Sequence, residues 1–207
     1  MKQFVLLSVA ALALAGCASA KPALAPASSK LQVPSSKAAA GAPAPKPPSD
    51  LSGFDLVAHA PDGWMASTGP DGRPEEGSIG SIRHVETGAV ILLYVSQSWT
   101  RTPTSIMKDI EANALAPMHR TVTARGGDEG DNPARVWITW EGLSDDETKL
   151  PIKGKIAVAR HPAPLDDVTA MVAGAWPAED ARLEQDFDMF ISTVDLVPKQ
   201  APPAPKP

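Results

Sequence analysis

The chain has 207 residues, a single cysteine and a formal net charge of −5, which leaves room for one domain of ordinary size and extended termini. Residues 51–197 carry 23 acidic and 12 basic side chains, whereas residues 18–50 carry four lysines and one acid, Asp50. An acidic domain disfavours nucleic acid and anionic lipid as partners. The lone cysteine excludes an intrachain disulfide, and no Cys/His spacing typical of zinc sites occurs.

The N-terminus has the pattern of a secretory signal peptide. Lys2 supplies a positive charge, and Phe4–Leu14 form an apolar run that is too short to span a bilayer. Leu14-Ala15-Gly16-Cys17 follows, and it resembles the lipobox of bacterial lipoprotein precursors. The resemblance implies cleavage between Gly16 and Cys17, a diacylglyceryl group on the Cys17 thiol, and an acyl chain such as palmitate on the new amino group.

Two or three acyl chains would hold the protein firmly to a bilayer. Ala18 rather than Asp follows the cysteine, and by resemblance to enterobacterial lipoproteins this favours the outer membrane, facing the periplasm. A competing interpretation remains open. Ala18-Ser19-Ala20 is also a site for ordinary signal peptidase, which would release a soluble protein beginning at Lys21.

Residues 17–50 are predicted to form a disordered tether behind the 1–16 signal peptide. Ala, Pro, Ser and Lys make up nearly all of this stretch, so it cannot bury enough apolar surface to offset its ordering entropy. Binding of this segment to peptidoglycan or to a partner is the alternative. The Pro-rich residues 198–207 are expected to form a second unstructured tail.

The predicted elements of the 51–197 domain come in the order strand, hairpin, helix, meander, helix. Alternating apolar residues and turn signals predict strands at 54–59, 79–86, 89–96, 121–125, 134–141, 153–160 and 168–175. Thr102 and Pro103 predict the start of a helix that Pro117 stops. Trp176–Asp180 predict the opening of a last helix with Leu183, Phe187 and Phe190 on its buried face. Trp64, after the Pro61-Asp62-Gly63 turn, is expected in the core, and Pro70-Asp71-Gly72 is expected to form a second turn.

This order predicts an α+β fold, with helices packed on a mainly antiparallel sheet. The opening strand, the Pro61–Trp64 turn, the helix after the strand pair and the ending Phe190–Leu196 resemble the PsbP-like superfamily. That resemblance implies an α/β/α sandwich over residues 51–197. It also implies a binding or assembly role rather than catalysis.

The sequence contains no recognisable catalytic motif. His84 and Glu86 would share a strand face, and Asp128–Asn132 concentrate oxygen ligands, but a surface pair and a mobile acidic loop are the simpler interpretations. Trp137 points away from the Trp140 face of its strand, so it lies either beneath a helix or in a partner contact. The sequence therefore predicts no catalytic residue, no metal and no cofactor beyond the acyl chains on Cys17.

These observations predict a membrane-anchored periplasmic lipoprotein. Its domain would be a non-enzymatic binding or assembly module for an envelope protein. The second partner would be the membrane lipid, reached through the acyl chains on Cys17. The alternatives are a periplasmic enzyme whose site escapes a motif search and a structural lipoprotein in contact with the cell wall.

Overall fold

A computed structural model of the protein describes residues 47–68 and 78–199. Gly16, Cys17, most of the predicted tether, the Pro70-Asp71-Gly72 turn and residues 200–207 lie outside these ranges. Within the described ranges, no helix is long and apolar enough to cross a membrane.

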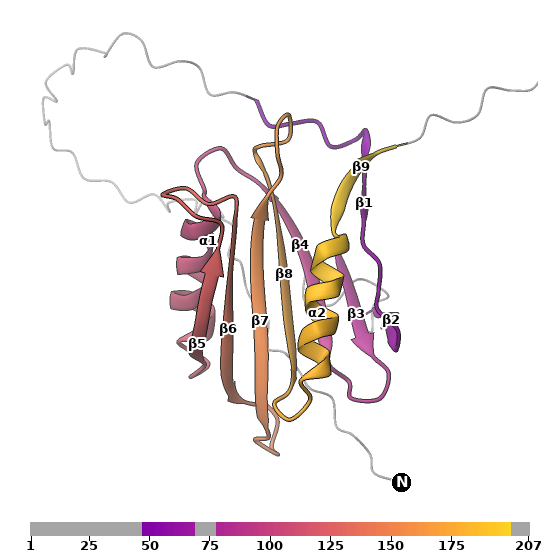
Figure 1. Ribbon diagram of the computed structural model, residues 1–207, viewed down its shortest axis with the longest axis vertical. Helices are drawn as coiled ribbons and strands as arrows, with labels where there is room; N and C mark the ends of the chain where they lie inside the picture. Colours follow the sequence, from indigo (N-terminus) through magenta and orange to yellow (C-terminus); the bar gives the residue numbers. More distant parts are fainter. Residues whose placement is uncertain (1–46, 69–77, 200–207) are drawn as a thin grey trace, which may run out of the picture. The chain divides into compact units, whose positions relative to one another are not determined.

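The framework is a seven-stranded antiparallel sheet in the order β2-β3-β4-β8-β7-β6-β5 (Figure 1). β8 is its central strand, paired over eight residues with β4 and over nine with β7. The strand bounds are Trp64–Ala66 for β2, Gly80–His84 for β3, Val90–Gln97 for β4, Thr121–Gly127 for β5, Arg135–Leu143 for β6, Pro151–Arg160 for β7 and Val168–Pro177 for β8.

Both faces of the sheet are covered, as the apolar run in β4 predicts. Val90, Leu92 and Tyr94 belong to a core cluster that includes residues of helix α1, Pro103–Ile110. The alternate residues Ile91 and Leu93 belong to a second cluster with helix α2, Arg182–Thr193. Because successive side chains of a strand point to opposite faces, the two helices cover opposite faces. The predicted α+β class and the α/β/α layering are confirmed.

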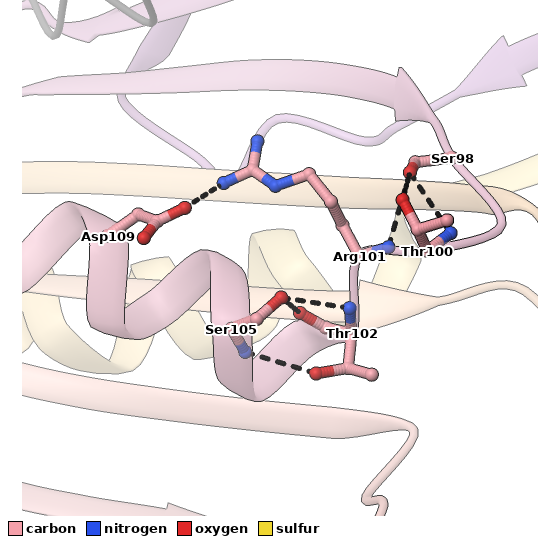
Figure 2. Close-up of polar contacts among 6 residues, drawn as sticks. All are labelled: Ser98, Thr100, Arg101, Thr102, Ser105 and Asp109. Carbon is pink, nitrogen blue, oxygen red and sulfur yellow. Dashed lines mark hydrogen bonds and ion pairs between the residues drawn. The ribbon is translucent and has the colours of Figure 1, made fainter. Parts of the chain in front are cut away.

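Helix α1 begins where the sequence predicts it. The Thr102 hydroxyl accepts the Ser105 N–H at 3.1 Å, and the Ser105 hydroxyl accepts the Thr102 N–H at 3.0 Å, which is a reciprocal capping box (Figure 2). Arg101 pairs with Asp109, and Ser98 accepts the N–H groups of Thr100 and Arg101. The helix continues as a π-helical turn, η2, at Glu111–Leu115.

Helix α2 begins later than predicted. Trp176 and Pro177 are the last residues of β8, where Pro177 is registered with Ile152. Proline is tolerated at the end of a strand because no ladder donor is needed there. The Trp176 ring lies 5.8 Å from that of Phe187 and both are fully buried, so the tryptophan belongs to the helix-covered core instead of opening the helix.

Two short strands have no counterpart in the prediction. β2 carries Trp64 into the second core cluster, which confirms the core position of that residue. β9, Asp195–Pro198, follows α2 directly and pairs with β1, Phe54–Val57. The pair forms a separate two-stranded ribbon that joins the two ends of the domain.

Candidate functional site

A pocket of about 190 Å³ lies on the α2 face of the sheet, where β7 ends and β8 begins. The β1–β9 ribbon and Val194, the residue that caps the end of α2, form its other wall. Leu56 of β1 and Leu196 of β9 are registered partners across the ribbon, and both line the pocket. The pocket thus combines residues that are far apart in the sequence.

The floor of the pocket is hollow because small side chains follow one another across the sheet. Arg135, Ala159, Ala170 and Val95 are registered in one row through β6, β7, β8 and β4. Two adjacent alanines leave space that larger side chains would fill. The remaining lining is mostly aliphatic, and Val168 contributes to it from the start of β8.

His161 and Asp195 form the polar part of the rim. His161 Nδ1 lies 3.0 Å from the Pro162 carbonyl oxygen, and because a carbonyl only accepts, this nitrogen carries the hydrogen. In the neutral ring, His161 Nε2 is therefore an acceptor, and it lies 3.5 Å from Asp195 Oδ1. The contact is an ion pair only when the imidazole is protonated. When the imidazole is neutral, two acceptor atoms, His161 Nε2 and Asp195 Oδ1, face each other.

Arg135 occupies the other side of the rim. It is opposite Ala159, which lies two residues before His161, so Arg135 and His161 are diagonal neighbours. Arg135 is exposed, and within the described residues its guanidinium has no ion-pair partner. Arg160 differs, since it donates to the Arg101 carbonyl beside α1, so its charge points to the opposite face of the sheet.

The structure places Trp137 on the α2 face, half-buried against the second core cluster. Its ring lies over Gly126 of the edge strand β5, the residue registered opposite to it. Lys155 Nζ lies 5.0 Å from the ring centroid and also binds Asp188 of α2 at 2.7 Å. Trp137 therefore lies between Gly126 and Lys155 at the margin of the helix-covered area. Its assignment as a partner contact stays a prediction.

The polar residues that the sequence singles out do not converge on a metal site. His84 Nδ1 accepts the Thr87 N–H at 3.3 Å, and its ring packs edge-on against Trp64. Asp128 accepts the Arg135 N–H within its own loop. Among the described residues, no group of three His, Cys, Asp or Glu side chains could hold a metal ion.

Asp145 and Asp146 have separate structural roles in the β6–β7 loop. Asp145 pairs at 2.9 Å with Arg120, whose side chain is 2% exposed and stacks on Trp140. Asp146 accepts hydrogen bonds from Thr148 and Ser144, which hold the pKa of its carboxyl below the ordinary value.

A buried carboxylate holds the first described residues of the chain to the domain. Asp167 is fully buried and accepts the Ser49 N–H at 2.8 Å and the Ser49 hydroxyl at 2.5 Å. The Gln97 amide at the end of β4 donates to the Ser49 carbonyl at 2.8 Å. We call this arrangement the Ser49 clamp. Asp167 directly precedes Val168 of the pocket lining, so the clamp and the pocket lie at the same end of the sheet.

The sequence offers little signal for this site. His161 is one of four histidines, and nothing local distinguishes it. Asp195 reaches it only because β9 pairs with β1, and the sequence does not predict β9. The alternation of β7 and β8 does predict which of their residues face α2, and hence which alanines line the floor.

Comparison with known proteins yields a likeness of fold. No family model matches the chain, and no curated protein matches it. A solved structure of LpqN, described as involved in cell envelope biogenesis of Mycobacterium tuberculosis, is similar with a TM-score of 0.47 and 11% sequence identity, over 74% of this chain and 87% of that one. At this identity and TM-score the likeness carries no conclusion about function.

Proposed function

We propose that the protein is a cell-envelope lipoprotein, anchored through acyl chains on Cys17, whose α+β domain is a non-enzymatic binding module. The observation that carries the proposal is the Leu14-Ala15-Gly16-Cys17 sequence behind an apolar leader. Ala18 rather than Asp follows the cysteine, which favours the outer membrane as the site of the anchor. The sandwich of a sheet between α1 and α2 is the layering that the PsbP-like resemblance implies.

The Ser49 clamp supports the anchored arrangement. A tether that delivers a domain to a membrane partner is most useful when its attachment point is defined, because its length then sets the effective concentration of the domain. Ser49 is held by both the buried Asp167 and Gln97, so the proposed tether would end there. The pocket lies beside this attachment point.

The character of the pocket supports binding as its role. Its lining is mostly aliphatic, with His161, Asp195 and Arg135 as polar groups at the rim, which is the usual composition of a small-molecule site. An enzymatic alternative would use His161 and Asp195 as its acid and base. That alternative predicts turnover of the bound compound, whereas the binding proposal predicts its recovery unchanged.

Mass spectrometry of the protein extracted from membranes with detergent tests the anchor. We expect a mature chain that begins at Cys17 and carries the mass of two or three acyl chains. The Cys17→Ala variant is the control, and we expect it to lose both the lipid mass and detergent-dependent extraction. An unmodified wild-type chain that begins at Lys21 in the soluble fraction would contradict the proposal.

Cross-linking in intact cells, followed by detergent extraction, tests the envelope partner. We expect one cross-linked species whose yield depends on the anchor and falls in the Cys17→Ala variant. A wild-type yield from the unanchored variant would contradict the positional mechanism. Trp137→Ala, which alters the margin of the α2 face, examines the predicted partner contact separately.

A further inference from the structure

We propose that the pocket on the α2 face binds a small primary ammonium compound with a short aliphatic tail. This inference rests on the proposed binding function and specifies its ligand. The tail would lie on the Ala159–Ala170 floor, and the ammonium group would bridge His161 Nε2 and Asp195 Oδ1 by donating to both.

The rim presents two hydrogen-bond acceptors side by side. The Pro162 carbonyl fixes the hydrogen on His161 Nδ1 and leaves Nε2 as a lone-pair acceptor 3.5 Å from a carboxylate oxygen. Asp195 Oδ1 also accepts the Leu196 N–H at 2.8 Å, which orients it at the rim. An ammonium group carries three N–H donors and a positive charge, so one such group satisfies both acceptors and neutralises the carboxylate.

The floor and walls suit a short aliphatic tail. Val95, Ala170 and Val168 on the sheet face Leu56, Val194 and Leu196 across the pocket. A volume of about 190 Å³ is equivalent to roughly six water molecules in the liquid. It therefore suits a tail of a few carbons and is too small to enclose a long acyl chain.

Arg135 limits the ligand to one ammonium group. Its guanidinium lies at the far side of the same rim, diagonal to His161, and would repel a second cation at the other end of a diamine. The charged residues that line the pocket are Arg135, Arg160, His161 and Asp195, and the Arg160 guanidinium bonds on the other face of the sheet. Asp195 is therefore the anion that faces the proposed ammonium group.

Three compounds with one carbon skeleton test the proposal on the full-length protein: 3-methylbutylamine, 3-methylbutanol and 3-methylbutanoate. Binding is measured by calorimetry and by NMR shifts of the His161 ring at pH 8. We expect the amine to bind at least tenfold more tightly than the alcohol or the carboxylate. Equal binding of amine and alcohol, tighter binding of the carboxylate, or no binding of the amine at millimolar concentration would each overturn the proposal.

Two variants locate the ammonium group. Asp195→Asn keeps the shape and removes the charge, and we expect it to weaken binding of the amine at least tenfold while binding of the alcohol stays unchanged. Glu147→Gln removes one exposed charge at the opposite end of β6 and β7, so it should leave binding of both compounds unchanged. Equal loss in both variants would show a general charge effect and overturn the assignment.

A variant of the histidine gives an independent readout. His161→Phe keeps an aromatic ring and removes the Nε2 acceptor that faces Asp195. We expect it to weaken binding of the amine severalfold while binding of the alcohol stays unchanged. Wild-type binding of the amine by this variant would contradict the proposed position. None of these measurements involves Cys17. A wrong ligand proposal can therefore be distinguished from a wrong anchor proposal.

Discussion

Two tryptophans of β6 pack on glycines of its two neighbouring strands, on opposite faces of the sheet. Trp140 is registered with Gly154 of β7, and Trp137 is registered with Gly126 of β5. At both glycines an added Cβ would lie within 2.5 Å of the indole ring. The large rings thus cover positions where a strand lacks side chains, which compensates for the weak packing of glycine in a sheet.

Gly154→Ala should destabilise the protein. Its Cβ would lie 2.1 Å from the Trp140 ring and 2.6 Å from the Gly174 carbonyl oxygen, and the latter belongs to backbone that cannot rotate away. We expect a loss of about 1–3 kcal/mol in the free energy of unfolding, as for other overpacked cores. Urea denaturation measures it.

Gly80→Ala is the matched control, because it is also a strand glycine and nothing lies within 4 Å of its Cβ position. We expect it to be neutral or to stabilise by about 0.5–1 kcal/mol. An equal loss in both variants would contradict the role of the Trp140 contact.

At the scale of the element, the β6–β7 loop is held by one carboxylate. Asp146 accepts from the Ser144 hydroxyl and from the backbone and side chain of Thr148, and the buried Ser144 in turn accepts the Leu150 N–H. These bonds favour the charged form and hold the pKa of Asp146 below the ordinary value of 3.8. The loop therefore depends on ionisation of Asp146.

Acid should weaken this loop over a defined range of pH. Since the pKa of Asp146 is lower in the folded state, its contribution to stability is complete above the unfolded pKa, near 4, and is lost as the pH falls through the folded pKa. We expect the melting temperature of Asp146→Asn to fall less steeply below about pH 4 than that of the wild type. Parallel curves from pH 6 to pH 2 would contradict this, and Glu147→Gln serves as the control.

Elements with strong local signals are predictable from the sequence, and those defined by tertiary pairing are not. Thr102 and Pro103 start α1 as predicted because capping is local. The three residues of β2 and the four of β9 are too short for a periodic pattern. Trp176 and Pro177 resemble a helix start, but burial of Trp176 against Phe187 keeps them in β8. Tertiary packing overrides local preference there.

At the scale of the whole molecule, the apolar residues on both faces of β4 predict the layering of the domain, but no sequence pattern predicts the pocket. Alternation assigns Ile91 and Leu92 to opposite faces without reference to any other element. The pocket requires β9 to return beside β1 and so bring Asp195 to His161. That contact depends on the path of the chain rather than on any short pattern.

The Ser49 clamp should govern how firmly the chain before β1 is held. Asp167→Asn keeps the shape of the side chain but removes its charge and replaces one acceptor oxygen with an amide group. We therefore expect faster hydrogen exchange at the Ser49 amide and faster proteolysis of the chain before Leu51. Charge-assisted bonds contribute about 1.5–3 kcal/mol each, so the exchange rate at Ser49 should rise by at least tenfold. Ser49→Ala, which keeps the backbone N–H, should show a smaller rise, and wild-type rates in both variants would contradict the clamp.

The position of the clamp also determines how the domain would respond to mechanical load. Tension on the chain ahead of Ser49 enters through Asp167 and Gln97, at the ends of β8 and β4. These two strands are joined over eight residue pairs inside the sheet, so the pull enters the sheet through interior strands rather than at an edge. The four residue pairs between β1 and β9 follow the clamp along the chain. They would therefore bear tension only after the hydrogen bonds of the clamp have broken.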